Sequence, residues 1–469
     1  MPFIDKLKHW AVDHGGRTAL IVGGQRLTYS ELLQAAESQA AEAHSVSTSG
    51  ARGVSVIDRP SSAELVVDFC AALFLGHTSM ILDASWPAAL RAKLTQAAQS
   101  WSSVQDPAVQ PFLLGLSSGT SGLPKAFVRT TESWRVSFVR SAKYFELGPD
   151  SVTLTPGPLA ASMNLYALGE SIHAGSTLVA LPRFSPDAAL DAMEVHGVTR
   201  LVLVPTVLEL MAARGMATGR DGGQLRSIVC AGSALPERTL TLARKWAPHA
   251  RIQQYYGAAE LGFVAASTVE PSAVEPSGAR AVGTAFPGVD ISIRDNDGCE
   301  MAAGEQGHIC VRSPYVCSGY AWGDDGLAFG EQATSWYTVR DQGHVDQNGV
   351  LHVSGRASEM IVTAGANVYP HAVEEGLAAA AGAACTIVVA GVMDGLRGQR
   401  VAAGIFNPTG PDAIDLAALR LAAAQLPAQQ RPGSYYFLSD LPLIGSGKTS
   451  RAMLGQWISE GDARAQRLH

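Results

Sequence analysis

A short polar segment at residues 117–125 has the composition of a loop that binds phosphate groups. Its sequence is Ser-Ser-Gly-Thr-Ser-Gly-Leu-Pro-Lys, and it follows an apolar run at residues 113–116 that predicts a strand. Glycines let the backbone curl with positive φ, and consecutive N–H groups and hydroxyls can surround a polyphosphate. The lysine adds a mobile positive charge. Taken alone, such a segment is more often a polar surface turn, so its meaning depends on the rest of the chain.

A second segment, residues 445–449, superficially resembles a nucleotide-binding P-loop. Its sequence is Gly-Ser-Gly-Lys-Thr. The P-loop motif needs a further glycine five residues before the final glycine. Pro442 occupies that position, and we therefore reject the P-loop interpretation.

Further motifs follow in order along the chain, and together with residues 117–125 they resemble the ANL superfamily of adenylating enzymes. This superfamily comprises acyl- and aryl-CoA synthetases, adenylation domains of peptide synthetases, and luciferases. The loop is similar to the superfamily's Ser/Thr-Ser-Gly-Thr-Thr-Gly-x-Pro-Lys core, with Ser121 and Ala126 where threonine and glycine are common. The resemblance covers about residues 20–455. The other matching segments are residues 27–32, 81–87, 231–236, 254–260, 304–320, 336–341, 355–356 and 441–451.

The resemblance implies a reaction in which a carboxylate attacks the α-phosphorus of ATP and expels pyrophosphate. Because the attacking oxygen is already ionised, catalysis should depend on positioning and on charge stabilisation rather than on a general base. Glu260 is the candidate Mg²⁺ ligand, since carboxylates and phosphate oxygens usually hold Mg²⁺. Lys448 corresponds to the C-terminal lysine that bridges the carboxylate and the α-phosphate. Lys125 of the loop completes the set of candidate catalytic residues.

The resemblance also implies which residues contact the nucleotide. Tyr256 would lie against adenine, Asp341 would accept hydrogen bonds from the ribose hydroxyls, and Arg356 would lie near the ribose and phosphates. The candidate ATP- and AMP-binding residues are Ser117, Ser118, Gly119, Thr120, Ser121, Gly122, Ala231, Gly232, Ser233, Gln254, Tyr255, Tyr256, Gly257, Ala259, Asp341 and Arg356.

Selectivity for the acid begins near residues 156–164 in this superfamily. The histidine that many acyl-CoA synthetases carry near Ala161 is absent, and so is the aspartate that α-amino-acid activators carry nearby. A buried ammonium group without a counter-charge is costly, which disfavours an α-amino acid as substrate. Several alanines predict a roomy, apolar cleft. The candidate substrate-pocket residues are Ala161, Met163, Asn164 and Ala258.

Two positions depart from the superfamily's pattern. Ala259 replaces a threonine whose hydroxyl commonly contacts phosphate, and the lost hydrogen bond is worth on the order of 1 kcal/mol. Ser358 stands where an aspartate or lysine usually forms the hinge of a small domain, although a serine can absorb the same backbone rotation. The glycine-rich stretch at residues 355–367 is retained, and it lines the thiol's approach in thioester-forming members.

The composition is typical of a well-buried enzyme of two or more domains. The chain has 469 residues, of which 47% are hydrophobic and 16% charged. A net charge of −7 argues against a general nucleic-acid binder. The six cysteines are scattered and fit neither a disulfide framework nor a zinc site. Charged residues occupy the N-terminus, and the apolar stretch at residues 65–82 is interrupted, so we expect a cytoplasmic protein without a membrane span.

Strand-like and helical stretches alternate along most of the chain and must position these residues. Such alternation implies parallel sheets covered by helices, with ligands at the carboxyl ends of the strands. From about residue 287, turns at residues 295–298 and 346–349 predict hairpins. The predicted strands are residues 53–57, 78–82, 177–181 and 200–204, and the predicted helices are residues 62–75, 186–196 and 416–424.

The resemblance implies an α/β fold with two domains. Residues 1–354 would form a large AMP-binding domain of parallel and mixed sheets flanked by helices, with a distorted β-barrel region. Residues 355–469 would form a small, mobile α+β domain that delivers Lys448 for adenylation and then presents residues 359–370 for a second step.

The favoured hypothesis is an acid–thiol ligase that uses ATP and Mg²⁺. It would adenylate a carboxylic acid and pass the acyl group to the thiol of CoA or of a carrier protein's phosphopantetheine, as a monomer or homodimer. One alternative is an adenylating enzyme that passes the acyl group to an amine or to a separate protein. Another is a non-catalytic binding protein with a relic site, which Ala259 and Ser358 would suggest.

Overall fold

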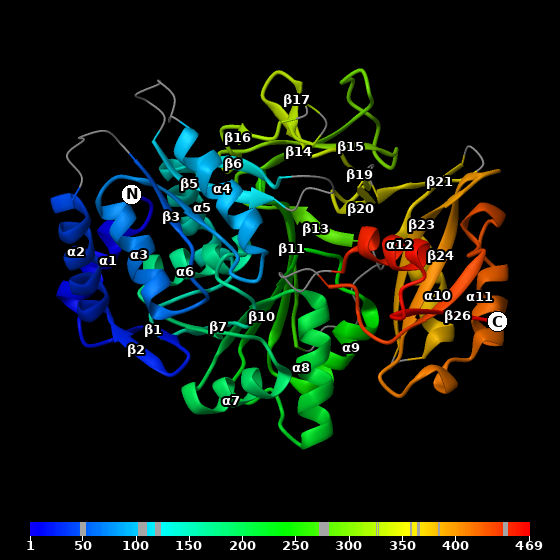
Figure 1. The fold of residues 1–469 in the computed structure, drawn as a ribbon, viewed down its shortest axis with the longest axis horizontal. Coiled ribbons are helices and arrows are strands. Elements are labelled where there is room, and N and C mark those ends of the chain that lie inside the picture. Colours follow the sequence, from blue (N-terminus) through cyan, green and yellow to red (C-terminus); the bar gives the residue numbers. More distant parts are fainter. Residues whose placement is uncertain are drawn as a thin grey trace. The chain divides into compact units, whose positions relative to one another are not determined.

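The chain forms two compact units in the computed structural model (Figure 1). The first unit comprises Met1–Pro276, Val282–Ile291 and Cys310–Val339, and the second comprises Ser277–Ala281, Ser292–Ile309 and Arg340–His469. The domain boundary between residues 354 and 355 stays a prediction. The described residues are 1–46, 53–101, 110–117, 123–271, 281–324, 326, 328–356, 359–363, 366–382, 385–443 and 449–469.

The larger sheet of the first unit contains six neighbouring parallel strands. The antiparallel strand β2 (Gln25–Thr28) closes one edge, and β12 (Gly262–Val269) and β13 (Ala281–Ala285) continue antiparallel from the other. Parallel strands end at the same edge of a sheet, where ligands usually bind. The parallel strands are, in spatial order, β1 (Thr18–Val22), β8 (Thr177–Ala180), β7 (Val152–Thr155), β9 (Arg200–Leu203), β10 (Ser227–Ala231) and β11 (Arg251–Ala258).

A second sheet of the first unit carries the predicted phosphate loop. Its parallel strands are β3 (Val54–Ile57), β4 (Thr78–Ile81) and β5 (Pro111–Ser117). β6 (Lys125–Thr130) runs antiparallel to β5, and β16 (Tyr320–Trp322) runs antiparallel to β6. Four further strands outside the six-stranded sheet of the second unit are β14 (Asp290–Arg294), β15 (Gly307–Arg312), β17 (Gly330–Ala333) and β18 (Trp336–Thr338).

Local sequence signals set the helix ends. The hydroxyl of Ser62 accepts a hydrogen bond from the Leu65 N–H at 3.2 Å and caps α3 (Ala63–Phe74). Ser185 caps α7 (Pro186–His196) in the same way, and this helix ends at Gly197 in the left-handed conformation. Both predicted helices are confirmed. The others in the first unit are α1 (Ile4–Asp13), α2 (Tyr29–Val46), α4 (Ala88–Ser100), α5 (Thr131–Tyr144), α6 (Ser162–Ala174), α8 (Pro205–Thr218) and α9 (Glu237–Trp246).

Two apolar cores hold the first unit together. One joins residues of β1, β8 and β5 with α1, α2, α3, α5 and α6, and it buries Phe3, Tyr29, Phe69 and Phe138 completely. The other joins β9 and β10 with α7, α8 and α9 around Trp246. The apolar stretch at residues 65–82 forms α3 and β4, as predicted, and among the described helices none is long and apolar enough to span a membrane.

The second unit has an α+β fold, in which helices cover both faces of one sheet (Figure 1). β23 (Thr386–Asp394) alternates between faces: Val389 packs with α10 (Pro370–Ala381) and α11 (Leu416–Ala424), whereas Val388 packs with α12 (Arg451–Glu460). The other strands of this sheet are β21 (Ile361–Thr363), β22 (Ala366–Val368), β24 (Gly398–Phe406), β25 (Ser434–Leu438) and β26 (Ala465–Leu468).

The same unit contains the predicted hairpin at residues 346–349. It joins β19 (Asp341–Val345) to β20 (Leu351–Arg356). The carboxylate of Asp346 accepts hydrogen bonds from the N–H groups of Asn348 and Val350 at 2.8 and 3.0 Å, which fixes the turn. The hairpin prediction is confirmed.

Candidate functional site

Two of the predicted catalytic residues belong to one charged cluster in the first unit. The hydroxyl of Tyr320 donates a hydrogen bond to Oε1 of Glu260 at 2.9 Å. Nζ of Lys125 lies 5.6 Å from the centre of the Tyr320 ring. Glu260 is only 6% exposed, so its charge is largely shielded from solvent. Tyr320 thus connects the lysine of the phosphate loop to the candidate metal ligand.

Neighbouring strands bring this cluster together. Ser117 pairs with Lys125 across β5 and β6, so the two ends of the phosphate loop meet. Tyr320 stands opposite Phe127 across β6 and β16, and the indole of Trp322 donates to the Pro124 carbonyl at 3.0 Å. The strand that carries Tyr320 therefore anchors the end of the loop. The five loop residues Ser118, Gly119, Thr120, Ser121 and Gly122 lie outside the described residues.

A buried arginine that the sequence did not single out fixes the backbone beside Glu260. Arg129 on β6 is 4% exposed and donates hydrogen bonds to the carbonyls of Ala259 and Tyr315. Burial lowers the pKa of Arg129, and the nearby groups Cys317 and Glu260 oppose this shift. A lone arginine in an apolar strand carries no signal of this role, because its partners lie more than a hundred residues away.

Burial also sets the protonation of the groups around Glu260. Burial and the charge of Glu260 raise the pKa of Tyr320, so its hydroxyl remains a hydrogen-bond donor at neutral pH. Burial raises the pKa of the Cys317 thiol to about 11. Since the thiolate is the reactive form of cysteine, Cys317 is a structural residue of this cluster rather than a nucleophile.

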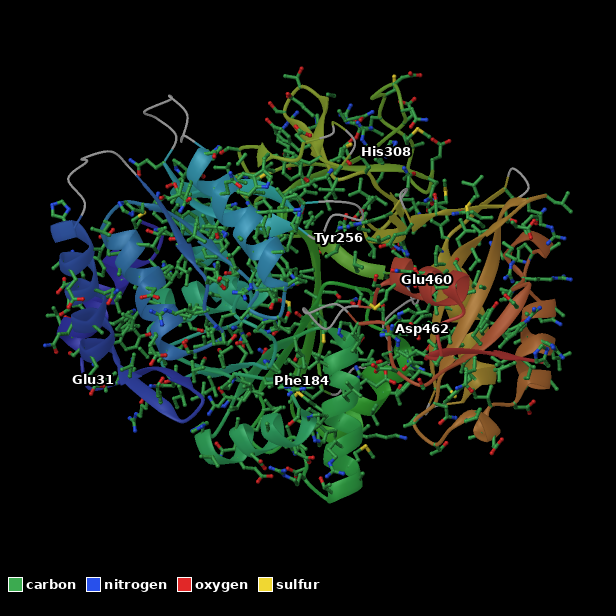
Figure 2. All side chains as sticks on the ribbon, in the orientation of Figure 1. Glu31, Phe184, Tyr256, His308, Glu460 and Asp462 are labelled. Carbon is green, nitrogen blue, oxygen red and sulfur yellow. The ribbon has the colours of Figure 1, made fainter. Side chains whose placement is uncertain are left out.

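The adenine-side candidates lie where β10 and β11 end. Ala231 stands opposite Tyr255 across these parallel strands, and Gly232 follows with φ +89°. Tyr256 lies on β11 and is labelled in Figure 2. A Cβ on Gly257 would lie 2.2 Å from the Gly262 carbonyl oxygen, so only glycine fits where β12 turns back. Of the remaining candidates, Gln254 and Ala258 lie on β11, Ala259 follows it, and Ser233 is exposed after β10.

The ribose-side candidates form an ion pair in the second unit. Asp341 begins β19 and stands opposite Arg356, the last residue of β20. Nε of Arg356 lies 3.3 Å from Oδ1 of Asp341, whose side chain is 8% exposed. The hairpin therefore places the predicted aspartate and arginine together. Lys448 and Ser358 lie outside the described residues.

The substrate-side candidates lie at the start of α6. Ala161 precedes the helix, and Met163 and Asn164 lie in its first turn. Asn164 is 3% exposed and donates to the Pro158 carbonyl at 2.9 Å, so it holds the preceding turn in place. Met163 borders a cavity of about 10 Å³ whose wall also includes Tyr255.

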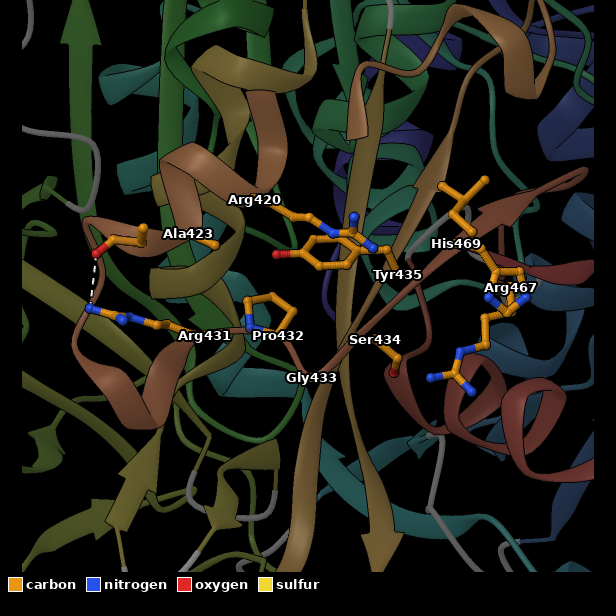
Figure 3. Close-up of a pocket in the computed structure, with 11 residues that line it drawn as sticks. Arg420, Ala423, Arg431, Pro432, Gly433, Ser434, Tyr435, Arg467 and His469 are labelled. Atoms are coloured by element: carbon orange, nitrogen blue, oxygen red, sulfur yellow. Dashed lines mark hydrogen bonds between the residues drawn. The ribbon is translucent and has the colours of Figure 1, made fainter. Parts of the chain in front are cut away.

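A larger cavity of about 420 Å³ opens on the second unit beside β25 (Figure 3). Arg420, Arg431, Tyr435 and Arg467 line it, and Arg431 donates to the Ala424 carbonyl at 2.9 Å. None of the predicted site residues is part of its lining. Within the described part of the chain, no group of three or more His, Cys, Asp or Glu residues could hold a metal.

Comparison with known proteins agrees with this architecture. The model of the AMP-binding enzyme family matches residues 90–321. The uncharacterised acyl-CoA ligase YhfT of Bacillus subtilis is 33% identical over 351 residues, covering 75% of this chain and 69% of that protein. The indoleacetate–CoA ligase of Aromatoleum aromaticum is 31% identical over 352 residues, covering 74% of this chain and 68% of that protein.

A solved structure matches over the whole length. It is o-succinylbenzoate CoA synthetase (MenE) from Bacillus subtilis in complex with its acyl-adenylate intermediate, with a TM-score of 0.80 and 25% identity, covering 100% of this chain and 99% of that one. The predicted α/β fold is confirmed. The chain belongs to the AMP-binding enzymes of the acyl-CoA ligase family, and it is an AMP-forming acid–thiol ligase that binds ATP.

Proposed function

We propose that this ligase adenylates a carboxylic acid with Mg²⁺ and ATP and passes the acyl group to the thiol of CoA. The observation that carries this proposal is the Lys125–Tyr320–Glu260 cluster beside the ends of the phosphate loop. Two relatives that are more than 30% identical bear the name of CoA ligases, which supports CoA as acceptor. The phosphopantetheine of a carrier protein is the alternative thiol.

The cluster fits a Mg²⁺ ion bound together with phosphate oxygens. Among the described residues, Tyr320 donates to one carboxylate oxygen of Glu260, which leaves the other oxygen for a metal. Mg²⁺ usually takes one or two carboxylates and completes its shell with phosphate and water. When bound, the ion would neutralise charge on the phosphates. Arg129 and Tyr320 hold Glu260 in place, and Lys125 adds a positive charge to the leaving pyrophosphate.

Further candidate residues would contact the adenine and the ribose of the nucleotide. In this proposal Tyr256 lies against adenine, while Asp341 accepts hydrogen bonds from the ribose hydroxyls. The ion pair with Arg356 orients the carboxylate of Asp341 for that role. The C-terminal domain at residues 355–469 delivers Lys448 to the carboxylate and α-phosphate, and then presents residues 359–370 to the thiol.

The role of Lys448 can be tested by pyrophosphate exchange. We expect Lys448→Ala to slow acid-dependent ATP–pyrophosphate exchange by about 10²- to 10³-fold, because the ammonium group stabilises charge in the transition state. ATP binding should remain measurable. Lys245→Ala is the matched control, since Lys245 is an exposed residue at the end of α9, and it should change neither quantity. Unchanged exchange in Lys448→Ala would remove this lysine from the mechanism.

The acyl acceptor is tested with the wild-type chain by adding CoA to the acid, Mg²⁺ and ATP. Consumption of CoA that depends on the acid and releases AMP supports the proposal. Exchange without CoA turnover that is rescued by a carrier protein or an amine would replace CoA with that acceptor. A panel of carboxylic acids that supports no exchange would contradict adenylation itself.

A further inference from the structure

A buried ion pair lies on the substrate side of the first unit. Glu170 on α6 and Arg200 at the start of β9 are 2% and 3% exposed. Nη2 of Arg200 donates to Oε2 of Glu170 at 2.9 Å. Removing two charges from water is expensive, and their attraction offsets the cost only when the remaining polar atoms are also hydrogen-bonded.

This pair is not fully hydrogen-bonded within the protein. Among the described residues, Oε1 of Glu170 and both Nε and Nη1 of Arg200 are buried without a hydrogen-bond partner. Each unsatisfied group of this kind costs about 1–3 kcal/mol, and more when it is charged. Native structures contain few such groups, and each one calls for a partner.

Glu170 and Arg200 border a cavity whose wall also includes Met163, one of the substrate-pocket residues predicted from the sequence. The cavity has a volume of about 10 Å³, enough for one oxygen-sized group. Met163, Ala167 and Glu170 share one face of α6, because they are spaced by four and three residues. From Met163 to Glu170, seven residues along α6 rise by about 10 Å. This span suits an acid with a ring and a short spacer.

Four aromatic and four aliphatic residues complete the wall of the cavity. Tyr255 and Phe263 lie with their ring centres 4.7 Å apart, and Phe263 and Tyr166 lie 5.3 Å apart. The Arg200 guanidinium lies 5.9 Å from the centre of the Phe145 ring. The Tyr166 hydroxyl forms hydrogen bonds with Ser137 and Ser141 on α5. Tyr166 therefore contributes its ring, and not its hydroxyl, to the wall of the cavity. Because the cavity itself has room for one oxygen-sized group, these rings would contact the part of the ligand that carries this group, where they favour an aromatic ring.

The charges of Glu170 and Arg200 determine which chemical group the remote end of a ligand can carry. A carboxylate would meet Arg200 but would lie against the like charge of Glu170, and an ammonium group would lie against Arg200. An apolar end would leave all three polar atoms unsatisfied. A hydroxyl can donate to Glu170 and accept from Arg200 at once, so it satisfies both residues.

We propose that Glu170 and Arg200 bind a hydroxyl group at the end of the substrate remote from its carboxylate, and that the substrate is an aryl carboxylic acid. This inference rests on the proposed function, since it assigns the acid that the enzyme adenylates. Glu170 and Arg200 determine specificity and take no part in the chemical step.

The test compares three acids of one shape with the wild-type enzyme. They are 3-phenylpropanoate, 3-(4-hydroxyphenyl)propanoate and 3-(4-carboxyphenyl)propanoate, with the corresponding phenylacetates as a shorter series. We expect kcat/KM for acid-dependent pyrophosphate exchange to be about 10- to 100-fold higher for the hydroxylated acid, as a hydrogen bond to charged groups would give. Equal rates, or preference for the unsubstituted acid, would mean that only water occupies the cavity and would overturn the proposal.

A double variant tests the residues themselves. Glu170→Leu with Arg200→Met removes both charges and keeps an apolar filling, and we expect the preference for the hydroxyl to disappear. The control is Glu132→Leu with Arg135→Met, an exposed ion pair on α5 whose removal should leave the ratio unchanged. A double variant that folds and retains the preference would overturn the proposal. Exchange with other carboxylic acids but with none of these would also overturn the inference, whereas exchange with no carboxylic acid at all would contradict the proposed function, so the two failures are distinguishable.

Discussion

Two arginine–glutamate clusters, one in each unit, differ in their burial and in how completely they are hydrogen-bonded. In the first unit, Glu170 and Arg200 share one hydrogen bond and leave three buried atoms without partners among the described residues. In the second unit, Arg451 donates to Glu359 at 3.0 Å and to both oxygens of Glu374 at 3.0 and 3.2 Å. One buried atom of this cluster, Nε of Arg451, has no partner among the described residues.

Within the described part of the chain, Glu374 has further partners and Glu170 does not. Oε1 of Glu374 accepts the Val389 N–H at 2.8 Å, and its Oε2 lies 2.9 Å from Nδ1 of His371. Burial raises the pKa of Glu374, but Arg451 and His371 outweigh burial and hold that pKa at about 2. This more completely bonded cluster ties the start of α12, three residues after Lys448, to α10. It therefore has a structural role, whereas the unsatisfied pair has the composition of a binding site.

The largest expected effect comes from breaking the cluster of Arg451 and Glu374. Arg451→Met should lower the free energy of unfolding by about 3–5 kcal/mol, because it leaves the buried charge of Glu374 uncompensated. Urea denaturation of the full chain measures this change. Arg135→Met removes one partner of an exposed pair and should have no measurable effect. A loss below about 1 kcal/mol in Arg451→Met would show that the cluster is not structural.

The pH dependence of the same cluster sharpens the comparison. The pKa of Glu374 falls from 4.5 to about 2 on folding, so its contribution is present above pH 4.5 and is lost as the pH falls toward 2. The difference between these two pKa values corresponds to about 3 kcal/mol of folding stability at neutral pH. The stability difference between wild type and Arg451→Met should therefore shrink between pH 4.5 and pH 3 in urea titrations. A difference independent of pH would assign the stability to packing instead.

Replacing both partners should have opposite effects in the two clusters. Glu170→Leu with Arg200→Met should be neutral or should stabilise the chain by about 1–4 kcal/mol, since it removes an incompletely bonded buried pair. Glu374→Leu with Arg451→Met should destabilise by about 1–3 kcal/mol, because the Val389 N–H and Glu359 lose their partners. Thermal or urea denaturation checks both. Equal effects of the two replacements would remove the distinction between the clusters.

Much of the fold could be predicted because its signals are local. Ser185, Pro186 and Gly197 mark both ends of α7, and the Asp346 turn marks the β19–β20 hairpin. The ordered motifs placed Lys125 and Glu260 within one site, although the loop between Ser117 and Lys125 is only partly described. The roles of the other candidate residues remain predictions.

The connections between distant residues could not be predicted. Glu170 and Arg200 are thirty positions apart, and each resembles an isolated charge in an apolar stretch until α6 packs on β9. Arg129 reaches Ala259 across 130 positions, and Tyr320 reaches Glu260 across 60. Sequence periodicity gives the buried face of an element but does not give its partner.

One competition experiment tests the central claim most directly. The wild-type enzyme, with Mg²⁺ and ATP but no CoA, is given equal amounts of 3-phenylpropanoate and 3-(4-hydroxyphenyl)propanoate, and the acyl-adenylates are quantified by mass spectrometry. We predict that the hydroxylated acyl-adenylate predominates by about 10-fold or more. A predominance of the unsubstituted adenylate would contradict the role of Glu170 and Arg200, and the absence of any acyl-adenylate, with these or any other acid, would contradict adenylation.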